Sequence, residues 1–285
     1  MKHAAIFFPA NPRKTEPRRG WAPALLRILV ARAGPFALPA NPRKTEPRRG
    51  WAPALLRVLV ARAGPFALLA VLNAQTAPIH SKRAAKNFEL TANPAASHWK
   101  KAPPIQAAID PFGKPSPGRF EFRTLWTATD LYFLFTCPYD TLNLKPDPST
   151  DQETNELWNW DVTEIFIGAD TDPEHRYREY QVSPQGEWVD LDIDRTAMDG
   201  KKAWLWNSGF AVKARIDAAK KIWYGEMRIP IASVDKRPPV PGRQFRINLY
   251  RLTGQAPNRQ STMWTPTMNR SHHTPEKFGR LLLER

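Results

Sequence analysis

The sequence has little that could cross-link or anchor the chain. Its 285 residues include one cysteine, Cys137, which excludes an internal disulfide. Cys137 ends the apolar run LYFLFTC, a position that favours a buried structural thiol over a catalytic one. The charge-free stretch from Ala63 to Ser81 contains Pro, Asn, Gln, Thr and His, so no segment is both apolar and long enough to span a bilayer. We therefore expect a soluble chain without integral membrane association.

Acidic residues are scarce at the N-terminus, and this alone explains most of the net charge of +15. Residues 1–74 contain 13 Lys and Arg but only 2 Asp and Glu, whereas the rest of the chain contains 29 and 25. The body is therefore close to +4, with its positive charges interleaved among acids. Such a distribution argues against a phosphate-binding surface, and we expect no nucleic-acid partner.

The basic residues of the leader belong to a duplication. PANPRKTEPRRGWAPALLRILVARAGPFAL at 9–38 recurs at 39–68 with one difference, Ile28 against Val58. Repeat architectures need at least about three units to bury a shared core, and these two are rich in proline and arginine. The leader therefore predicts no folded domain, only a disordered or cleaved segment.

The second repeat runs into a segment typical of secretory signals. Arg57 and Arg62 precede a mostly apolar run that ends in small residues, with cleavage expected after Ala74 or Ala77. Two explanations of the longer leader stay open, an atypical signal or a translation start assigned too far upstream, since no methionine lies between Met1 and Met198. We expect a secreted or periplasmic protein with a leader at 1–74, a linker at 75–87 and one domain at 88–285.

The body reads as a series of short strands. Runs such as RFEFRTLWT, LYFLFTC, DVTEIFIG, RYREYQVS, EWVDLDI, GFAVKARI, KIWYGEMRI, QFRINLYRL and RLLLE are rich in aromatic and branched residues and are bounded by turn residues. Helical periodicity is scarce, and only IPIASVDK predicts a turn or two of helix. The expected fold is all-β, an antiparallel β-sandwich of jelly-roll or immunoglobulin-like type, with PFGKPSPG and the segment 139–155 as rim loops.

One acidic residue occupies an unusual position. In the run DVTEIFIG, alternation places Glu164 on the same strand face as Val162 and Phe166. A carboxylate among apolar side chains needs a cation, several hydrogen-bond donors or a ligand that donates to it.

Tryptophans are abundant in the body, where nine follow residue 74. Trp126 and Trp223 lie inside strand patterns and are predicted to be core residues. Trp158 and Trp264 lie in polar segments with few apolar neighbours. A flat aromatic ring packs well on the apolar face of a pyranose, while nearby carboxylates, amides and guanidinium groups bind the hydroxyls.

Five segments, in order and spacing, resemble carbohydrate-binding module family 9, within the DOMON-like group. They are LWNWDVTEIFIG, YREYQVSPQGEWVDLD, IWYGEMRIPIASV, FRINLYR and WTPTMNRSHHTPEKFGRLLL, and they cover roughly residues 88–284. The resemblance implies a non-catalytic β-sandwich that holds a sugar unit between two tryptophans. It also implies structural calcium in some members.

The resemblance also suggests individual site residues. Trp158 and Trp264 match the two clamp tryptophans, and Glu164 matches the acidic residue of the motif after Trp158. Arg178 falls near a sugar-contacting arginine of some members. The segment that contains Asn248 and Arg251 is typical of the family, and both are candidate contacts. We expect a polysaccharide terminus or oligosaccharide as ligand, a role in carbohydrate catabolism, and glycoside hydrolases as partner enzymes.

Two other functions compete with this interpretation. A glycosidase needs two carboxyl groups about 5–10 Å apart across a cleft; Asp161, Glu164, Glu179 and Glu226 are available, but each lies within a strand-like family motif. A haem-binding module would use Met and His as axial ligands; Met227, Met263, Met268, His272 and His273 are the candidates.

The segment DLDIDRTAMDGK superficially resembles a calcium-binding loop. Arg195 and Lys201 replace the glycine and glutamate that an EF-hand requires, so this segment is not one. Alternation instead predicts Asp190, Asp192 and Asp194 on a solvent-facing side of an edge strand.

Overall fold

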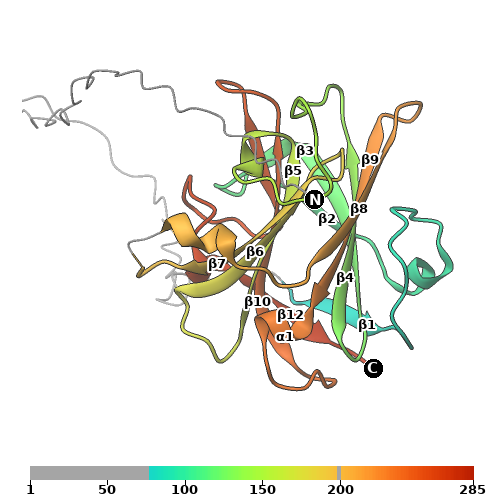
Figure 1. Ribbon diagram of the computed structural model, residues 1–285, viewed down its shortest axis with the longest axis vertical. Coiled ribbons are helices and arrows are strands. Elements are labelled where there is room, and N and C mark those ends of the chain that lie inside the picture. Colours follow the sequence, from blue (N-terminus) through green and yellow to red (C-terminus); the bar gives the residue numbers. More distant parts are fainter. Residues whose placement is uncertain (1–76, 198–199) are drawn as a thin grey trace, which may run out of the picture. The chain divides into compact units, whose positions relative to one another are not determined.

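The computed structural model describes residues 77–197 and 200–285, so the duplicated leader and the expected cleavage site after Ala74 lie outside it. The described residues form twelve strands in one mixed, mainly antiparallel sheet, which folds into two facing layers (Figure 1). In chain order the strands are β1 (Ile79–Arg83), β2 (Ile105–Ile109), β3 (Pro115–Trp126), β4 (Asp130–Pro138), β5 (Val162–Ala169), β6 (Arg176–Val182), β7 (Trp188–Asp194), β8 (Ala211–Asp217), β9 (Ile222–Pro230), β10 (Gln244–Thr253), β11 (Gln260–Met263) and β12 (Gly279–Leu283).

The helices are all short. They comprise α1 (Ile231–Val234) and four 3-10 helices, η1 (Ser97–Lys101), η2 (Leu157–Asn159), η3 (Gly200–Leu205) and η4 (Pro275–Lys277). Within the described residues no helix is long and apolar enough to cross a membrane. The expected all-β sandwich is confirmed.

The strands follow the order β7-β6-β5-β10-β11-β2-β3-β4-β9-β8, while β1 lies parallel to both β12 and β3. All nine runs singled out in the sequence are strands, and α1 lies in the one segment with helical periodicity. The strands β1, β2 and β11 were not predicted. Each is at most 5 residues long and has no clear alternation, so its partners define it. β1 makes part of the expected 75–87 linker a member of the sheet.

The main core lies between the two layers. Ile165 and Ile167 of β5 meet Phe133 of β4 and Met227 of β9 there. Trp126 and Trp223 are fully buried, as predicted. Cys137 is also fully buried, and burial raises the pKa of its thiol to about 12, which confirms a structural thiol.

β5 is buried along its whole length, on both faces. Thr163, Ile165 and Ile167 face the main core, so Glu164 and Phe166 face the opposite side of the layer. Phe166 packs there in a separate cluster with Tyr177, Tyr250, Met263 and Phe278. This outer face, covered in part by the chain between β11 and β12, positions the site described below.

Two expectations about loops need correction. PFGKPSPG is not a simple rim loop, because β3 begins at Pro115, which pairs with Ile109 of β2. Proline is tolerated at the first residue of a strand. The aspartates of β7 are not a solvent-facing row either. Asp190 is fully buried and accepts a hydrogen bond from the backbone N–H of Ser208 (2.9 Å), because the chain after η3 covers this side of β7.

Candidate functional site

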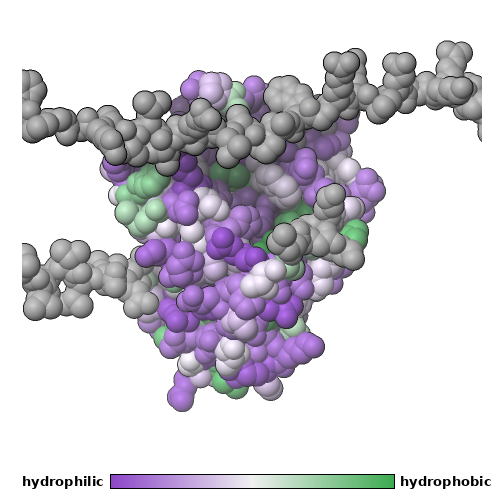
Figure 2. Space-filling model, turned by 90° about the vertical axis from the view of Figure 1, so that its left-hand side faces the viewer, coloured by the Kyte–Doolittle hydropathy of each residue, from purple (hydrophilic) through white to green (hydrophobic). Residues whose placement is uncertain are grey.

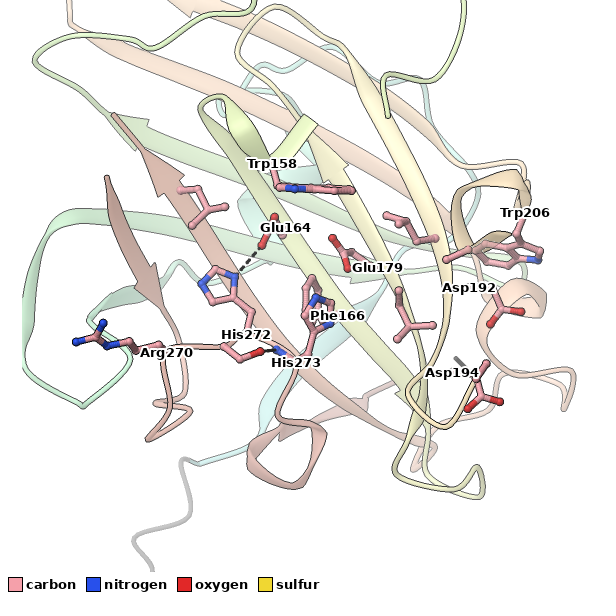
Figure 3. Close-up of a pocket in the computed structure, with 16 residues that line it drawn as sticks. Trp158, Glu164, Phe166, Glu179, Asp192, Asp194, Trp206, Arg270, His272 and His273 are labelled. Atoms are coloured by element: carbon pink, nitrogen blue, oxygen red, sulfur yellow. Dashed lines mark hydrogen bonds and ion pairs between the residues drawn. The ribbon is translucent and has the colours of Figure 1, made fainter. Parts of the chain in front are cut away.

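A cavity of about 780 Å³ opens on the outer face of β5, β6 and β7. Its walls come from η2, from the η3 region and from the segment 270–273, and Figure 3 shows their side chains around the opening. Seen from the side that carries β7, the surface is mainly hydrophilic, with separate small hydrophobic areas (Figure 2). A cavity of this size lies in the range of small-ligand sites, about 300–1,000 Å³.

Trp158 forms one wall, and its backbone is held from below. η2 begins after Glu156, which has a left-handed backbone conformation (φ 60°) and turns the chain toward the cavity. The guanidinium of Arg259 donates hydrogen bonds to the carbonyl oxygens of Trp158, Trp160 (2.6 Å) and Gly254 (2.6 Å). The ring of Trp158 is therefore presented over the cavity by a fixed loop (Figure 3).

Asp161 fixes the same loop at the start of β5. Its two carboxylate oxygens accept hydrogen bonds from the backbone N–H groups of Gly254 (2.7 Å) and Asn143 (3.2 Å). Burial raises the pKa of Asp161, and these two bonds oppose the rise. This carboxyl group has a structural role and does not reach the cavity.

Glu164 and Glu179 line the floor of the cavity and are called the acid pair below. Glu164 pairs with Gln181, and Phe166 with Glu179, across the antiparallel β5–β6 ladder. The two glutamates are thus diagonal neighbours on one face. They are only 2 % and 4 % exposed, so two carboxyl groups share a small, mostly apolar environment.

His272 supplies the partner that Glu164 requires. Its Nδ1 lies 3.2 Å from Oε2 of Glu164, and its Nε2 lies 2.6 Å from the hydroxyl of Ser261. The imidazole stacks on Tyr250, with ring centroids 4.5 Å apart. His273 is bound to the hydroxyl of Tyr177 at 2.6 Å. Both histidines are therefore fixed parts of the cavity wall.

Glu179 has a different environment. Its carboxylate accepts a hydrogen bond from the side-chain amide of Gln181. Burial and the negative charge of Glu164 raise the pKa of Glu179 well above its usual value, and the bond from Gln181 opposes this only in part. Burial also lowers the pKa of His273. The environment of Glu179 therefore favours its protonated form more than that of an exposed glutamate.

Of the six residues that the sequence suggested as carbohydrate contacts, the structure brings only Trp158 and Glu164 together. Arg178 lies on the other face of β6, with its guanidinium 2.6 Å from Asp192 and stacked on Trp206. Asn248 donates to the carbonyl of Thr265 (2.8 Å). Arg251 points between the layers and donates to the carbonyl of Arg119 (3.0 Å). Hydrogen bonds inside the fold thus engage all three.

Trp264 is the main correction. Its ring is 8 % exposed and belongs to the main core, so it does not face Trp158 across a cleft. The polar residues near it in the sequence misled the prediction, because its apolar contacts come from distant strands. One of these contacts is Gly279 of β12, whose missing side chain leaves room for the ring.

Glu179, His272 and His273 were not predicted as binding residues, although each was a candidate ligand or acid in the competing functions. Alternation along β6 would have placed Glu179 opposite Tyr180, but only the β5–β6 register sets it beside Glu164. Another carboxylate candidate, Glu226, accepts hydrogen bonds from the backbone N–H groups of residues 91 and 92 on the far side of the sandwich. The methionines proposed for haem do not converge: Met227 and Met263 are buried in separate clusters, and Met268 is exposed.

Calcium cannot be assigned to residues. In the described ranges, no three His, Cys, Asp or Glu side chains are grouped as metal ligands. Glu153 and Asp190 form one carboxyl pair, in which burial and the hydrogen bond to Asp190 raise the pKa of Glu153 to about 8. Two carboxyl groups are too small a donor set for a calcium ion, which takes 6–8 oxygen ligands.

Comparison with known proteins adds three similar structures. The family described as "Carbohydrate family 9 binding domain-like" matches residues 94–285. A putative carbohydrate-binding protein from Bacteroides uniformis is 13 % identical, with a TM-score of 0.55 over 73 % of this chain and 99 % of that one. A family 9 module from Caldicellulosiruptor kristjanssonii in complex with cellotriose is 14 % identical, with a TM-score of 0.50 over 73 % and 93 % of the two chains.

The same module in complex with glucose gives 13 % identity and a TM-score of 0.50 over 72 % and 96 % of the chains. At these identities the likeness concerns the fold alone. No curated protein matches the chain in sequence.

Proposed function

Because the chain belongs to the carbohydrate family 9 binding domain-like family, we propose that it binds a carbohydrate in the cavity beside Trp158, without catalysis. The observation that carries this proposal is the ring of Trp158 held over the acid pair (Figure 3). An aromatic face and buried carboxyl groups on one wall and floor match the apolar face and the hydroxyls of a pyranose.

The binding mode differs from a clamp of two tryptophans. Among the described residues, Trp158 is the one tryptophan above the acid pair, and Glu164 with His272 supplies polar contacts below it. Trp206 and Ala203 line the cavity from the η3 side. The volume of about 780 Å³ leaves room for more than one sugar unit. Glucose and cellotriose, which the family 9 module from C. kristjanssonii holds, are the first ligands to test.

The position of the acid pair argues against hydrolysis. A glycosidase places its two carboxyl groups on either side of the scissile bond. Glu164 and Glu179 instead lie side by side on one sheet face, beneath the same ring (Figure 3). We propose that the release of reducing sugars from glucans stays at background. If the parent protein released reducing sugars and Glu164→Gln did not, the non-catalytic assignment would be overturned.

Calorimetry on Trp158→Ala tests the site. Loss of a central aromatic anchor costs about 2 kcal/mol, or about thirtyfold in Kd. Trp204→Ala is the matched control, because Trp204 is exposed and does not line the cavity. We expect cellotriose binding to weaken in Trp158→Ala alone, while both variants melt as the parent protein does. Equal binding by Trp158→Ala and the parent would show that the cavity is not the sugar site.

The proposed biological setting is export and carbohydrate catabolism alongside glycoside hydrolases. It rests on the signal-like segment before Ala74 and on the family of the domain. Intact-mass analysis of the exported protein should find an N-terminus near Gln75 or Pro78. Recovery of the 9–68 repeats on a stable cytoplasmic product would contradict export.

A further inference from the structure

The cavity that we propose as the sugar site contains more acidic side chains than basic side chains that could neutralise them. Its acidic side chains are those of Glu164, Glu179, Asp192 and Asp194. Asp192 lies 2.6 Å from the guanidinium of Arg178, and Asp194 lies 3.8 Å from that of Arg176. The exposed Arg270 at the rim points away from the acid pair (Figure 3). The acid pair therefore decides the charge of the floor.

The two members of the acid pair are not equally compensated. Glu164 has His272 at 3.2 Å and also interacts with Arg259, which lies beneath η2. Glu179 has one hydrogen bond, from Gln181, and in the described part of the chain no Lys, Arg or His forms an ion pair with it. Its second carboxylate oxygen has no hydrogen-bond partner among those residues, and its side chain lines the cavity while 4 % exposed.

A buried carboxyl group in this position favours a ligand that brings a positive charge. Such a charge would lie between the oxygens of Glu164 and Glu179, both of which lie beneath the ring of Trp158 (Figure 3). Charge-assisted hydrogen bonds are about twice as strong as neutral ones, and a cation near the face of a tryptophan gains further attraction. Neutral hydroxyl groups would form weaker hydrogen bonds with the same oxygens.

We propose that the cavity prefers a sugar that carries a primary ammonium group, an amino sugar, with the ammonium held between Glu164 and Glu179 and the ring stacked on Trp158. This inference rests on the proposed carbohydrate-binding function and names its ligand class. General attraction does not explain such a preference, because the body of the chain is itself positive, with 29 Lys and Arg against 25 Asp and Glu after residue 74.

Binding of an ammonium group also has a consequence for protons. Burial and the nearby Glu164 raise the pKa of Glu179 well above its usual value in the free protein. An ammonium group favours the ionised form of Glu179 and so opposes this rise in pKa, and we expect its binding to release protons to the buffer. The other titratable groups around the pair include those of His272 and His273 on the wall and of Asp192, Asp194 and Arg178 on the β7 side. Tyr177, Tyr250 and Arg259 also interact with one or both glutamates.

The experiment compares three sugar series of equal length by calorimetry at about pH 6.5, below the usual pKa range of an amine. The series are β-1,4-linked glucosamine oligosaccharides, their N-acetylated counterparts and cello-oligosaccharides. We expect the glucosamine series to bind about tenfold more tightly than the other two, and its binding enthalpy to depend on the buffer's ionisation enthalpy through net release of protons.

Glu179→Gln is the key variant, because it keeps the shape and removes the charge. It should bring the glucosamine series to the affinity of the cello series and abolish proton release, with binding of neutral sugars retained. Asp151→Asn is the control, since it removes one exposed charge outside the cavity. An equal loss of preference in Asp151→Asn would overturn the proposal. Equal binding of all three series by the parent would also overturn it, while leaving the carbohydrate site intact; no binding of any series would overturn both.

Discussion

Trp264→Ala distinguishes a core tryptophan from a sugar clamp. The ring of Trp264 is packed in the main core, 8 % exposed, and its backbone N–H donates to the carbonyl of Leu249 (3.0 Å). Removing it leaves a cavity between the layers and also loses the transfer free energy of a large apolar group. Replacement of a buried tryptophan by alanine destabilises proteins by about 3–5 kcal/mol.

A second substitution, at Gly279, tests the packing of the Trp264 ring independently. A Cβ added at Gly279 would lie 2.6 Å from Cη2 of Trp264, closer than carbon atoms approach in folded proteins. Gly279→Ala should therefore destabilise the parent protein by about 1–3 kcal/mol, as overpacking does. In the Trp264→Ala background the added methyl enters the space that the ring has left, so the same change should cost much less.

Thermal and urea unfolding, followed by circular dichroism, measure all four corners of this cycle. For a domain of about 200 residues, 1 kcal/mol corresponds to about 2–4 °C in Tm, so Trp264→Ala should melt about 10 °C earlier. We expect a coupling energy between positions 264 and 279 of about 1–2 kcal/mol. Unchanged melting of Trp264→Ala together with lost sugar binding would refute the assignment of the ring to the core and restore it as a clamp.

Variants at two further acidic residues, the buried Glu226 and the half-buried Glu153, test carboxyl groups away from the sugar cavity. Glu226 accepts hydrogen bonds from the backbone N–H groups of residues 91 and 92 (both 2.6 Å) and from the indole of Trp99 (3.0 Å). Glu226→Ala should lower the free energy of unfolding by about 3 kcal/mol, with a smaller loss in Glu226→Gln. An unchanged free energy in urea unfolding would contradict the anchoring of residues 84–102 by Glu226. The folded-state pKa of Glu153, about 8, lies above its unfolded value of 4.5, so the native state holds a proton that the unfolded state loses, and stability falls as pH rises between these values. Glu153→Gln should therefore reduce the loss of Tm between pH 5 and pH 8, and an unchanged pH profile would contradict the raised pKa of Glu153.

Much of the architecture was predictable from the sequence because strand patterning is local. The run LYFLFTC and its neighbours show their branched and aromatic content without reference to any partner, and all nine such runs are strands. The short strands β1, β2 and β11 carry no such pattern. Their backbone hydrogen bonds are completed by strands far along the chain, for example Ile79 beside Leu281, so only the assembled sheet defines them.

The site divides in the same way. Alternation alone put Glu164 on a face with Phe166 and showed that it needs a partner, and the polar setting of Trp158 pointed to an accessible ring. The partner, His272, lies 108 residues from Glu164 in the sequence. It reaches Glu164 only because the chain between β11 and β12 folds over the outer face. Glu179 joined the site only through the β5–β6 register.

Trp158 and Trp264 show most clearly where local information ends. Both have polar neighbours in the sequence, yet one ring lines a cavity and the other is packed in the core. The sequence by itself determined an all-β body, nine of its strands, a buried thiol at Cys137 and a carboxylate at Glu164 in need of a partner, because each follows from residue type and period over a few positions. Which tryptophan meets the cavity, and which acid lies beside Glu164, was decided by the tertiary structure, because burial depends on the contacts that distant strands bring to each side chain.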